Sequence, residues 1–222
     1  MATKIEGTYD DGTVVVSFEG HLIEVTVTAS GDVAHDWVEE TYHIRRRRSR
    51  SRRHPSRVAV GLDAKWQQPR SRRHPSPVAV LSLCADRRCL VFQILRGDRV
   101  PRALSAFLAD SRRFTFVGTG AAACAAKLSD EHRLEVAEPV ELADLAADAL
   151  GRNDLRGEDL PRLAREVMGV QMETPPQRGR DAEWKARTLT DGQLKHACAY
   201  AFAAMVVASR LSDDGEWRDV VP

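Results

Sequence analysis

The sequence predicts an α/β fold in which a mixed sheet is flanked by helices. Three apolar runs of strand length follow one another between residues 58 and 95, and their short spacers predict an antiparallel meander. Beyond residue 100, helical and strand patterns alternate. The 222 residues, 43% of them hydrophobic, are enough for one sizeable core or for one domain with a flexible segment.

Residues 1–42 predict a hairpin and a short helix that pack on the domain. Two β-branched runs, Thr13–Phe18 and Leu22–Thr28, flank a segment that is typical of a turn. Residues 33–40 then place apolar side chains on one side of a short helix.

Residues 43–57 form a segment dense in arginine and without apolar periodicity. Repulsion between the like charges predicts that this segment is solvated and flexible. Part of it recurs, because residues 50–60 and 70–80 have closely similar sequences, each a basic loop followed by the start of a strand. Two copies are too few for a solenoid, so a local duplication within one hairpin is expected.

Residues 58–211 carry the main domain, and a polar tail at 212–222 is expected to fray. Asp159 predicts the N-cap of one of its helices. In chain order, the expected elements are strands at 58–63, 78–84 and 89–95, a helix from Pro101, a strand at 114–118, a helix at 121–128, a strand at 136–140, and helices at 141–150, 160–168 and about 190–211.

Composition and targeting signals predict an intracellular protein of the nucleus or cytoplasm. The formal net charge is +1, so the whole molecule is not a polycation. The N-terminus lacks the apolar stretch of a signal peptide, and no apolar run reaches membrane-spanning length. Four cysteines lack a convincing zinc spacing and are expected to be buried, reduced thiols. They are Cys84, Cys89, Cys124 and Cys198.

Asp63 ends a buried strand, where a carboxylate is costly unless something pairs with it. The segment around it and four later blocks together resemble the plant Werner-syndrome-like 3′–5′ exonucleases of the DEDD superfamily, over about residues 10–211. The resemblance implies a ribonuclease-H-like fold with a mixed five-stranded sheet flanked by helices. The blocks that carry it are residues 60–66, 89–95, 116–120, 160–169 and 196–202.

The resemblance also implies four metal-binding carboxylates and a tyrosine, most of which this chain lacks. The family binds two Mg²⁺ or Mn²⁺ ions, which clamp the attacking and leaving oxygens. In its Asp-x-Glu motif, Asp63 is retained but Lys65 replaces the glutamate. Cys124 occupies the place of the second aspartate, and the Tyr-x-x-x-Asp motif reads His196 to Tyr200.

These replacements predict a degenerate exonuclease with no cofactor, or with Mg²⁺ or Mn²⁺ if activity remains. Lys65 adds a positive charge where a cation would sit, so Asp63 alone would be a weak metal ligand. The expected state is a collapsed site in which Lys65 pairs with Asp63. Three alternatives stay open: an active exonuclease that uses other acids (Asp86, Asp130 and Asp191), a zinc site of Asp63, Cys124 and His196, and a non-enzymatic interaction module.

Two further features have competing interpretations. Gly118-x-Gly120 follows a strand and opens a helix, which is typical of dinucleotide binding but equally of a close strand-to-helix turn. Trp66 and Trp184 are candidates for stacking on bases, although buried packing is the commoner use.

The arginines predict weak nucleic-acid binding through phosphates, a nuclear import signal, or a linker with no partner. A protein partner or homo-oligomer is also open, whereas a membrane is not expected. The candidate nucleic-acid-binding residues are Arg45, Arg46, Arg47, Arg48, Arg52, Arg53, Arg72 and Arg73.

Overall fold

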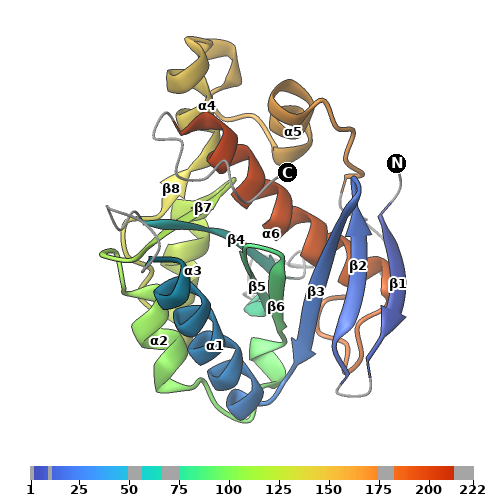
Figure 1. Cartoon of the computed structure of the whole chain (residues 1–222). Helices are drawn as coiled ribbons and strands as arrows, with labels where there is room; N and C mark the ends of the chain where they lie inside the picture. The colour runs from blue at the N-terminus through green and yellow to red at the C-terminus, as the bar shows by residue number, and fades with distance from the viewer. Residues whose placement is uncertain (1–2, 10–11, 50–56, 67–75, 175–182, 213–222) are drawn as a thin grey trace.

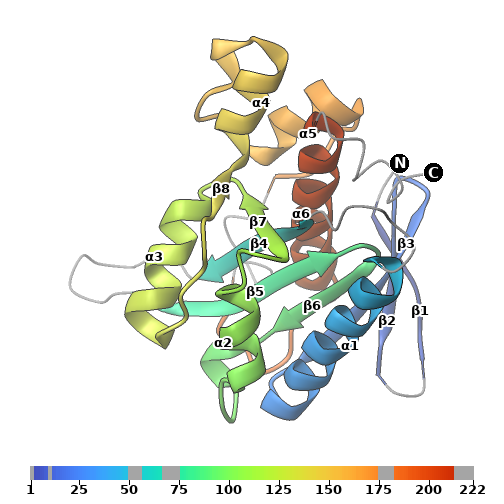
Figure 2. The same cartoon turned by 60° about the vertical axis from the view of Figure 1, so that its left-hand side comes forward.

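The computed structural model describes residues 3–9, 12–49, 57–66, 76–174 and 183–212. Its described strands form one mixed sheet in the order β1-β2-β3-β6-β5-β4-β7-β8 (Figures 1 and 2). The strands are β1 (Lys4–Thr8), β2 (Val14–Phe18), β3 (His21–Thr28), β4 (Val58–Trp66), β5 (Val78–Ala85), β6 (Arg88–Phe92), β7 (Phe114–Gly118) and β8 (Val140–Glu141).

The central strands confirm the predicted meander, since β4 pairs antiparallel with β5 and β5 with β6. The expectation of five strands is wrong. The N-terminal hairpin does not simply pack on the domain but extends its sheet, because β3 pairs in parallel with β6 from Glu24↔Arg88 to Thr28↔Phe92. β1 then adds to β2 at the edge. The strand expected at 136–140 is also shorter and later, at Val140–Glu141.

In the described part of the chain, three helices cover each face of the sheet. Apolar side chains of α1 (Gly31–Ser49), α2 (Arg102–Leu108) and α3 (Ala121–His132) share one core cluster with alternate residues of β4, β5 and β6. Those of α4 (Leu142–Leu150), α5 (Leu160–Met168) and α6 (Asp191–Leu211) belong to the cluster on the other face. Short 3₁₀ turns lie at Ile94–Arg96 and Asn153–Leu155.

Local capping explains where the last two helices begin. Asp159 accepts a hydrogen bond from the backbone N–H of Arg162 at 3.0 Å, as its N-cap position predicts. Thr190 and Gln193 form a reciprocal capping box at the start of α6. α6 is buried along nearly its whole length, in agreement with its apolar stripe.

α1 is much longer than the expected helix at 33–40, and it reaches into the arginine segment. The expectation that residues 43–49 are flexible is therefore wrong. Thr41 is buried, the ring of Tyr42 lies 5.2 Å from that of Phe114, and the Tyr42 hydroxyl donates to Asp110 at 3.0 Å. These contacts stabilise the last turns of the helix, although their sequence has no apolar periodicity. The arginines there lie at the C-terminal end of α1, where the helix dipole favours positive charge.

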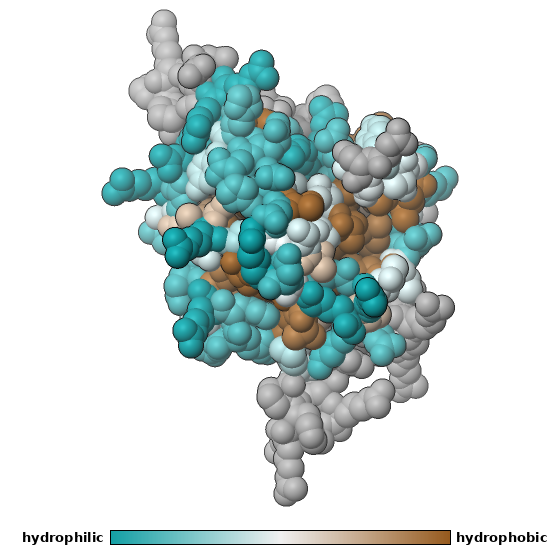
Figure 3. Space-filling view, turned by 90° about the horizontal axis from the view of Figure 1, so that it is seen from below, coloured by the Kyte–Doolittle hydropathy of each residue, from teal (hydrophilic) through white to brown (hydrophobic). Residues whose placement is uncertain are grey.

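On the face seen from below in Figure 3, hydrophilic residues cover most of the described surface, and hydrophobic residues gather in patches between them. Among the described residues, the exposed large hydrophobic side chains come from five separate parts of the chain, and such single exposures are normal. They are Tyr9, Leu22, Val33, Leu95 and Leu150. None of the helices in the described ranges combines the length and the apolar character needed to cross a bilayer.

Candidate functional site

β4 directs Asp63 and Lys65 toward α6. Alternate residues of a strand share one face, so both side chains lie on the same side as Gly61. A Cβ atom on Gly61 would lie 1.7 Å from the carbonyl oxygen of Ala201, so only glycine lets α6 approach this closely. The sequence held this signal, a glycine within a buried apolar run, but its meaning is clear only once α6 is placed.

Lys65 and Asp63 form a largely buried ion pair. The Lys65 Nζ lies 2.9 Å from Asp63 Oδ2, and it donates to Oδ1 at 3.1 Å. Only 11% of the Lys65 side chain and 19% of the Asp63 side chain are exposed. The expected pairing is therefore present, and the ammonium is the cation that lies against the carboxylate.

Aromatic rings complete the surroundings of the ammonium. The Lys65 Nζ lies 4.5 Å from the ring centroid of Tyr200 and 5.9 Å from that of Trp184, distances that favour cation–π attraction. The His196 ring lies 4.0 Å from the Tyr200 ring. Trp184 is 6% exposed, so it packs in the core here and is not free to stack on bases.

His196 is held as a neutral imidazole. Burial, with a smaller contribution from the charge of Lys65, lowers its pKa to about 3. Its Nε2 atom is buried and has no hydrogen-bond partner. The ring therefore adds no second positive charge beside Lys65 at neutral pH.

Cys124 and Tyr200 provide no anion. Burial, and then the nearby charge of Asp63, raise the pKa of the Cys124 thiol to about 12. Burial likewise raises the pKa of Tyr200, whose hydroxyl donates to the backbone oxygen of Glu173 at 3.3 Å. Both groups are therefore protonated at neutral pH.

This set of residues does not fit a divalent metal ion. Mg²⁺ and Mn²⁺ require several oxygen ligands, mostly anionic. Burial raises the pKa of Asp63, although the charge of Lys65 acts in the opposite direction, and the ammonium already neutralises the carboxylate. No three His, Cys, Asp or Glu side chains in the described part of the chain are grouped as metal ligands. The zinc alternative and the substitute acids therefore find no support in this geometry.

The glycine segment after β7 serves a close turn. The N–H groups of Gly120 and Ala121 donate to the carboxylate of Glu141 at 2.7 and 3.0 Å. A Cβ atom on Gly118 would lie 2.4 Å from the backbone oxygen of Leu62. A bound pyrophosphate would need these same N–H groups as donors. Because Glu141 already accepts from them, the geometry does not favour dinucleotide binding here.

The structure places only some of the candidate arginines. Arg45 is half-buried near the end of α1, and Arg46 and Arg47 are exposed beside it. Arg48 is helical, but its side chain lies outside the described residues. The remaining candidates, Arg52, Arg53, Arg72 and Arg73, also lie outside them.

Comparison with solved structures identifies the fold. The catalytic core of RRP6 from Trypanosoma brucei matches with a TM-score of 0.65 and 13% identity, over 84% of this chain and 46% of that chain. RNase D from Escherichia coli matches with a TM-score of 0.65 and 17% identity, over 84% of this chain and 44% of that one. The chain thus has the ribonuclease-H-like 3′–5′ exonuclease fold and spans less than half the length of either matched chain. No family model and no curated protein matches the sequence.

Proposed function

We propose that this chain binds nucleic acid and does not hydrolyse it. The observation that carries the second part is the Lys65 ammonium, 2.9 Å from Asp63. Hydrolysis by two metals needs ions about 4 Å apart that several carboxylates hold between substrate oxygens. Here a fixed positive charge lies against the carboxylate, and the neighbouring Cys124, His196 and Tyr200 are neutral.

Two observations support the nucleic-acid part. RNase D, which shares the fold, is described as an exoribonuclease involved in structured RNA processing. The arginines at the end of α1 offer charges that can displace counterions from phosphates without reading sequence. The relationship to plant Werner-syndrome-like exonucleases and a nuclear or cytoplasmic location belong to the same proposal and rest on the sequence.

A nuclease assay tests the loss of hydrolysis. Labelled single-stranded and recessed DNA and RNA are incubated with the protein and Mg²⁺ or Mn²⁺. We expect no release of nucleotides beyond that seen with an Asp63→Ala variant. Release that disappears in the Asp63→Ala variant would overturn the proposal, since Asp63 would then be catalytic.

Calorimetry with Mn²⁺ tests the physical reason. The triple variant Lys65→Glu, Cys124→Asp and Tyr200→Asp returns acids to three replaced positions, and we expect it to bind Mn²⁺ where the parent does not. Lys65→Met is the matched control, because it removes the ammonium without adding a ligand. Two tight Mn²⁺ sites in the parent protein would contradict the proposal.

Fluorescence anisotropy tests the binding of nucleic acid. Because the expected contacts are to phosphates, affinity should fall steeply and linearly on a log–log scale as salt increases. Replacing Arg45, Arg46 and Arg47 with glutamine should weaken binding equally for all sequences and reduce the salt slope. Absence of binding to DNA or RNA at low salt would instead favour the interaction-module alternative.

A further inference from the structure

A small pocket lies at the opposite end of β4 from the Asp63 site. It is a partly open hollow, lined by residues from the last turns of α1, the first residues of β4 and β7, and the β5–β6 turn. Figure 2 shows the C-terminal end of α1 beside the end of β5. Val58, the first residue of β4, lines the pocket, so Asp63 is five residues and about 16 Å away along the strand.

The pocket combines apolar walls with two guanidinium groups. Ile44, Val58 and Phe114 contribute to the walls, and Arg45, Arg88 and the acidic Asp86 also line the space. The Arg88 guanidinium lies 5.8 Å from the Trp37 ring, and that of Arg45 lies 5.9 Å from the Phe114 ring. Both arginines are thus held against aromatic faces in fixed places.

Arg88 has an unused donor. Its Nη1 is buried without a hydrogen-bond partner. An unsatisfied buried donor costs free energy, more so when it belongs to a charged group, and it therefore calls for an explanation. Burial lowers the pKa values of Arg88 and Arg45, and nearby acids act in the opposite direction, so both arginines stay charged. The Nε of Arg45 already donates to the backbone oxygen of Arg113 at 3.3 Å, so the unused donor of Arg88 is the stronger argument for an anion.

The size of the pocket limits what the anion can be. Its volume is about 40 Å³, whereas one water molecule needs roughly 10–15 Å³ on the same measure. The space therefore fits a group of a few heavy atoms, such as a phosphate, and not a base or a sugar. Arginine N–H groups match phosphate oxygens in both charge and geometry.

We propose that this pocket binds a phosphate group at the end of a nucleic-acid strand. The exposed Arg46 and Arg47 follow on the same helix turn and would contact further phosphates, which favours a strand over a free ion. That the phosphate belongs to a nucleic-acid strand rests on the proposed function. That the pocket binds a phosphate does not depend on it.

Anisotropy with matched oligonucleotides tests this site. A single-stranded oligonucleotide with a 5′-phosphate, one with a 3′-phosphate and one with neither are titrated at constant salt, with inorganic phosphate as competitor. One phosphorylated form should bind about tenfold more tightly than the unphosphorylated form, the value of one charge-assisted contact. Arg88→Met, which keeps the apolar stem, should abolish that difference, whereas the control Arg102→Met, which replaces an exposed arginine at the start of α2, should retain it.

Ile44→Phe provides a second variant, since it fills the pocket and leaves both guanidinium groups in place. It should also abolish the preference, and circular dichroism shows whether each variant is folded. Equal affinity for all three oligonucleotides, or a preference that survives in Arg88→Met, would overturn the site while leaving weak nucleic-acid binding intact. Binding of inorganic phosphate that requires Arg88, with no binding of any oligonucleotide, would keep the phosphate site and overturn the proposed function.

Discussion

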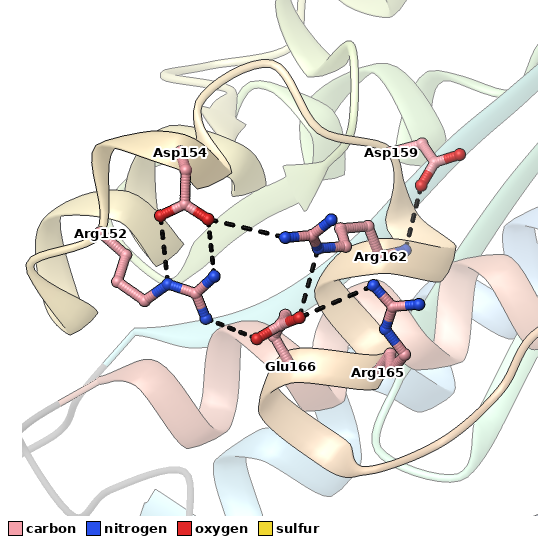
Figure 4. Close-up of polar contacts among 6 residues, drawn as sticks. All are labelled: Arg152, Asp154, Asp159, Arg162, Arg165 and Glu166. Carbon is pink, nitrogen blue, oxygen red and sulfur yellow. Dashed lines mark hydrogen bonds and ion pairs between the residues drawn. The ribbon is translucent and has the colours of Figure 1, made fainter.

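Two clusters of opposite charges lie in very different surroundings. At the candidate site, Lys65 and Asp63 form one pair with 11% and 19% of their side chains exposed. Between the 3₁₀ turn after α4 and the helix α5, Arg152 links Asp154 and Glu166, and Arg162 contacts the same two acids (Figure 4). In this second cluster, 40% of Arg152 and 54% of Asp154 are exposed, and Glu166 is the least exposed member at 23%.

The difference shows that the distance between two charged groups does not indicate how much their ion pair stabilises the folded protein. Arg152 lies 2.6 Å from Asp154, closer than Lys65 lies to Asp63, and its acidic partners raise its pKa further above the ordinary value. Water and salt screen such exposed pairs, so the formal shift corresponds to little stability. The buried pair is weakly screened, and removing one member leaves the other without a partner.

Breaking the buried pair should have the largest effect. Lys65→Met leaves the Asp63 carboxylate buried without a counter-charge, so the free energy of unfolding at pH 7 should fall by about 4 kcal/mol. Because Lys65 lowers the pKa of Asp63, the variant should bind a proton more readily, and the loss should shrink as the pH is lowered.

Urea unfolding of Lys65→Met at pH 7 and pH 5 measures this loss. The matched control is Asp63→Leu combined with Lys65→Met, which removes both charges and should recover most of the stability. If the single and double variants are equally unstable, the cost comes from lost packing and the comparison between the two clusters fails.

Gly61→Ala tests the packing that encloses the pair. Its Cβ would overlap the backbone of Ala201, which cannot move aside like a flexible side chain, so a loss of about 3 kcal/mol is expected from overpacking. Gly7→Ala is the control, since a Cβ there meets nothing within 4 Å in β1. Urea unfolding of the two variants should differ strongly, and similar midpoints would show that α6 shifts at little cost.

His196 should make the free energy of unfolding depend on pH, with an effect smaller than those of the two preceding variants. Its pKa is lowered to about 3 in the folded protein from an ordinary 6.5, so the unfolded chain binds more protons between these values and stability falls with decreasing pH. From pH 6.5 to pH 5 this amounts to about 2 kcal/mol. A His196→Phe variant should lack that part of the slope in urea unfolding, and an unchanged slope would show that the ring becomes protonated where it lies.

Local sequence patterns predicted the parts of this fold that depend on residues close together in the sequence. The meander, the Asp159 cap and the pairing of Lys65 with Asp63 follow from short spacings or from charges two residues apart. The pairing of β3 with β6 joins segments more than sixty residues apart, and no local pattern encodes it. The extension of α1 into the arginine segment was also not predicted. Tyr42 holds this part of the helix by its contacts with Phe114 and Asp110, which are distant in sequence.

A substitution in the more exposed cluster should change the free energy of unfolding least. Glu166 contacts Arg152, Arg162 and Arg165, so Glu166→Gln removes the acid at its centre (Figure 4). The urea midpoint should move far less than in Lys65→Met, because the arginine partners of Glu166 are 33–55% exposed and water can solvate them once the acid is neutralised, although Glu166 itself is 23% exposed. Repeating the measurement in 1 M NaCl should erase the remaining shift, since the screening length falls to about 3 Å, whereas the Lys65→Met shift should persist. A Glu166→Gln loss as large as that of Lys65→Met, and as resistant to salt, would mean that the network holds α5 in place as firmly as the buried pair stabilises the contact between β4 and α6.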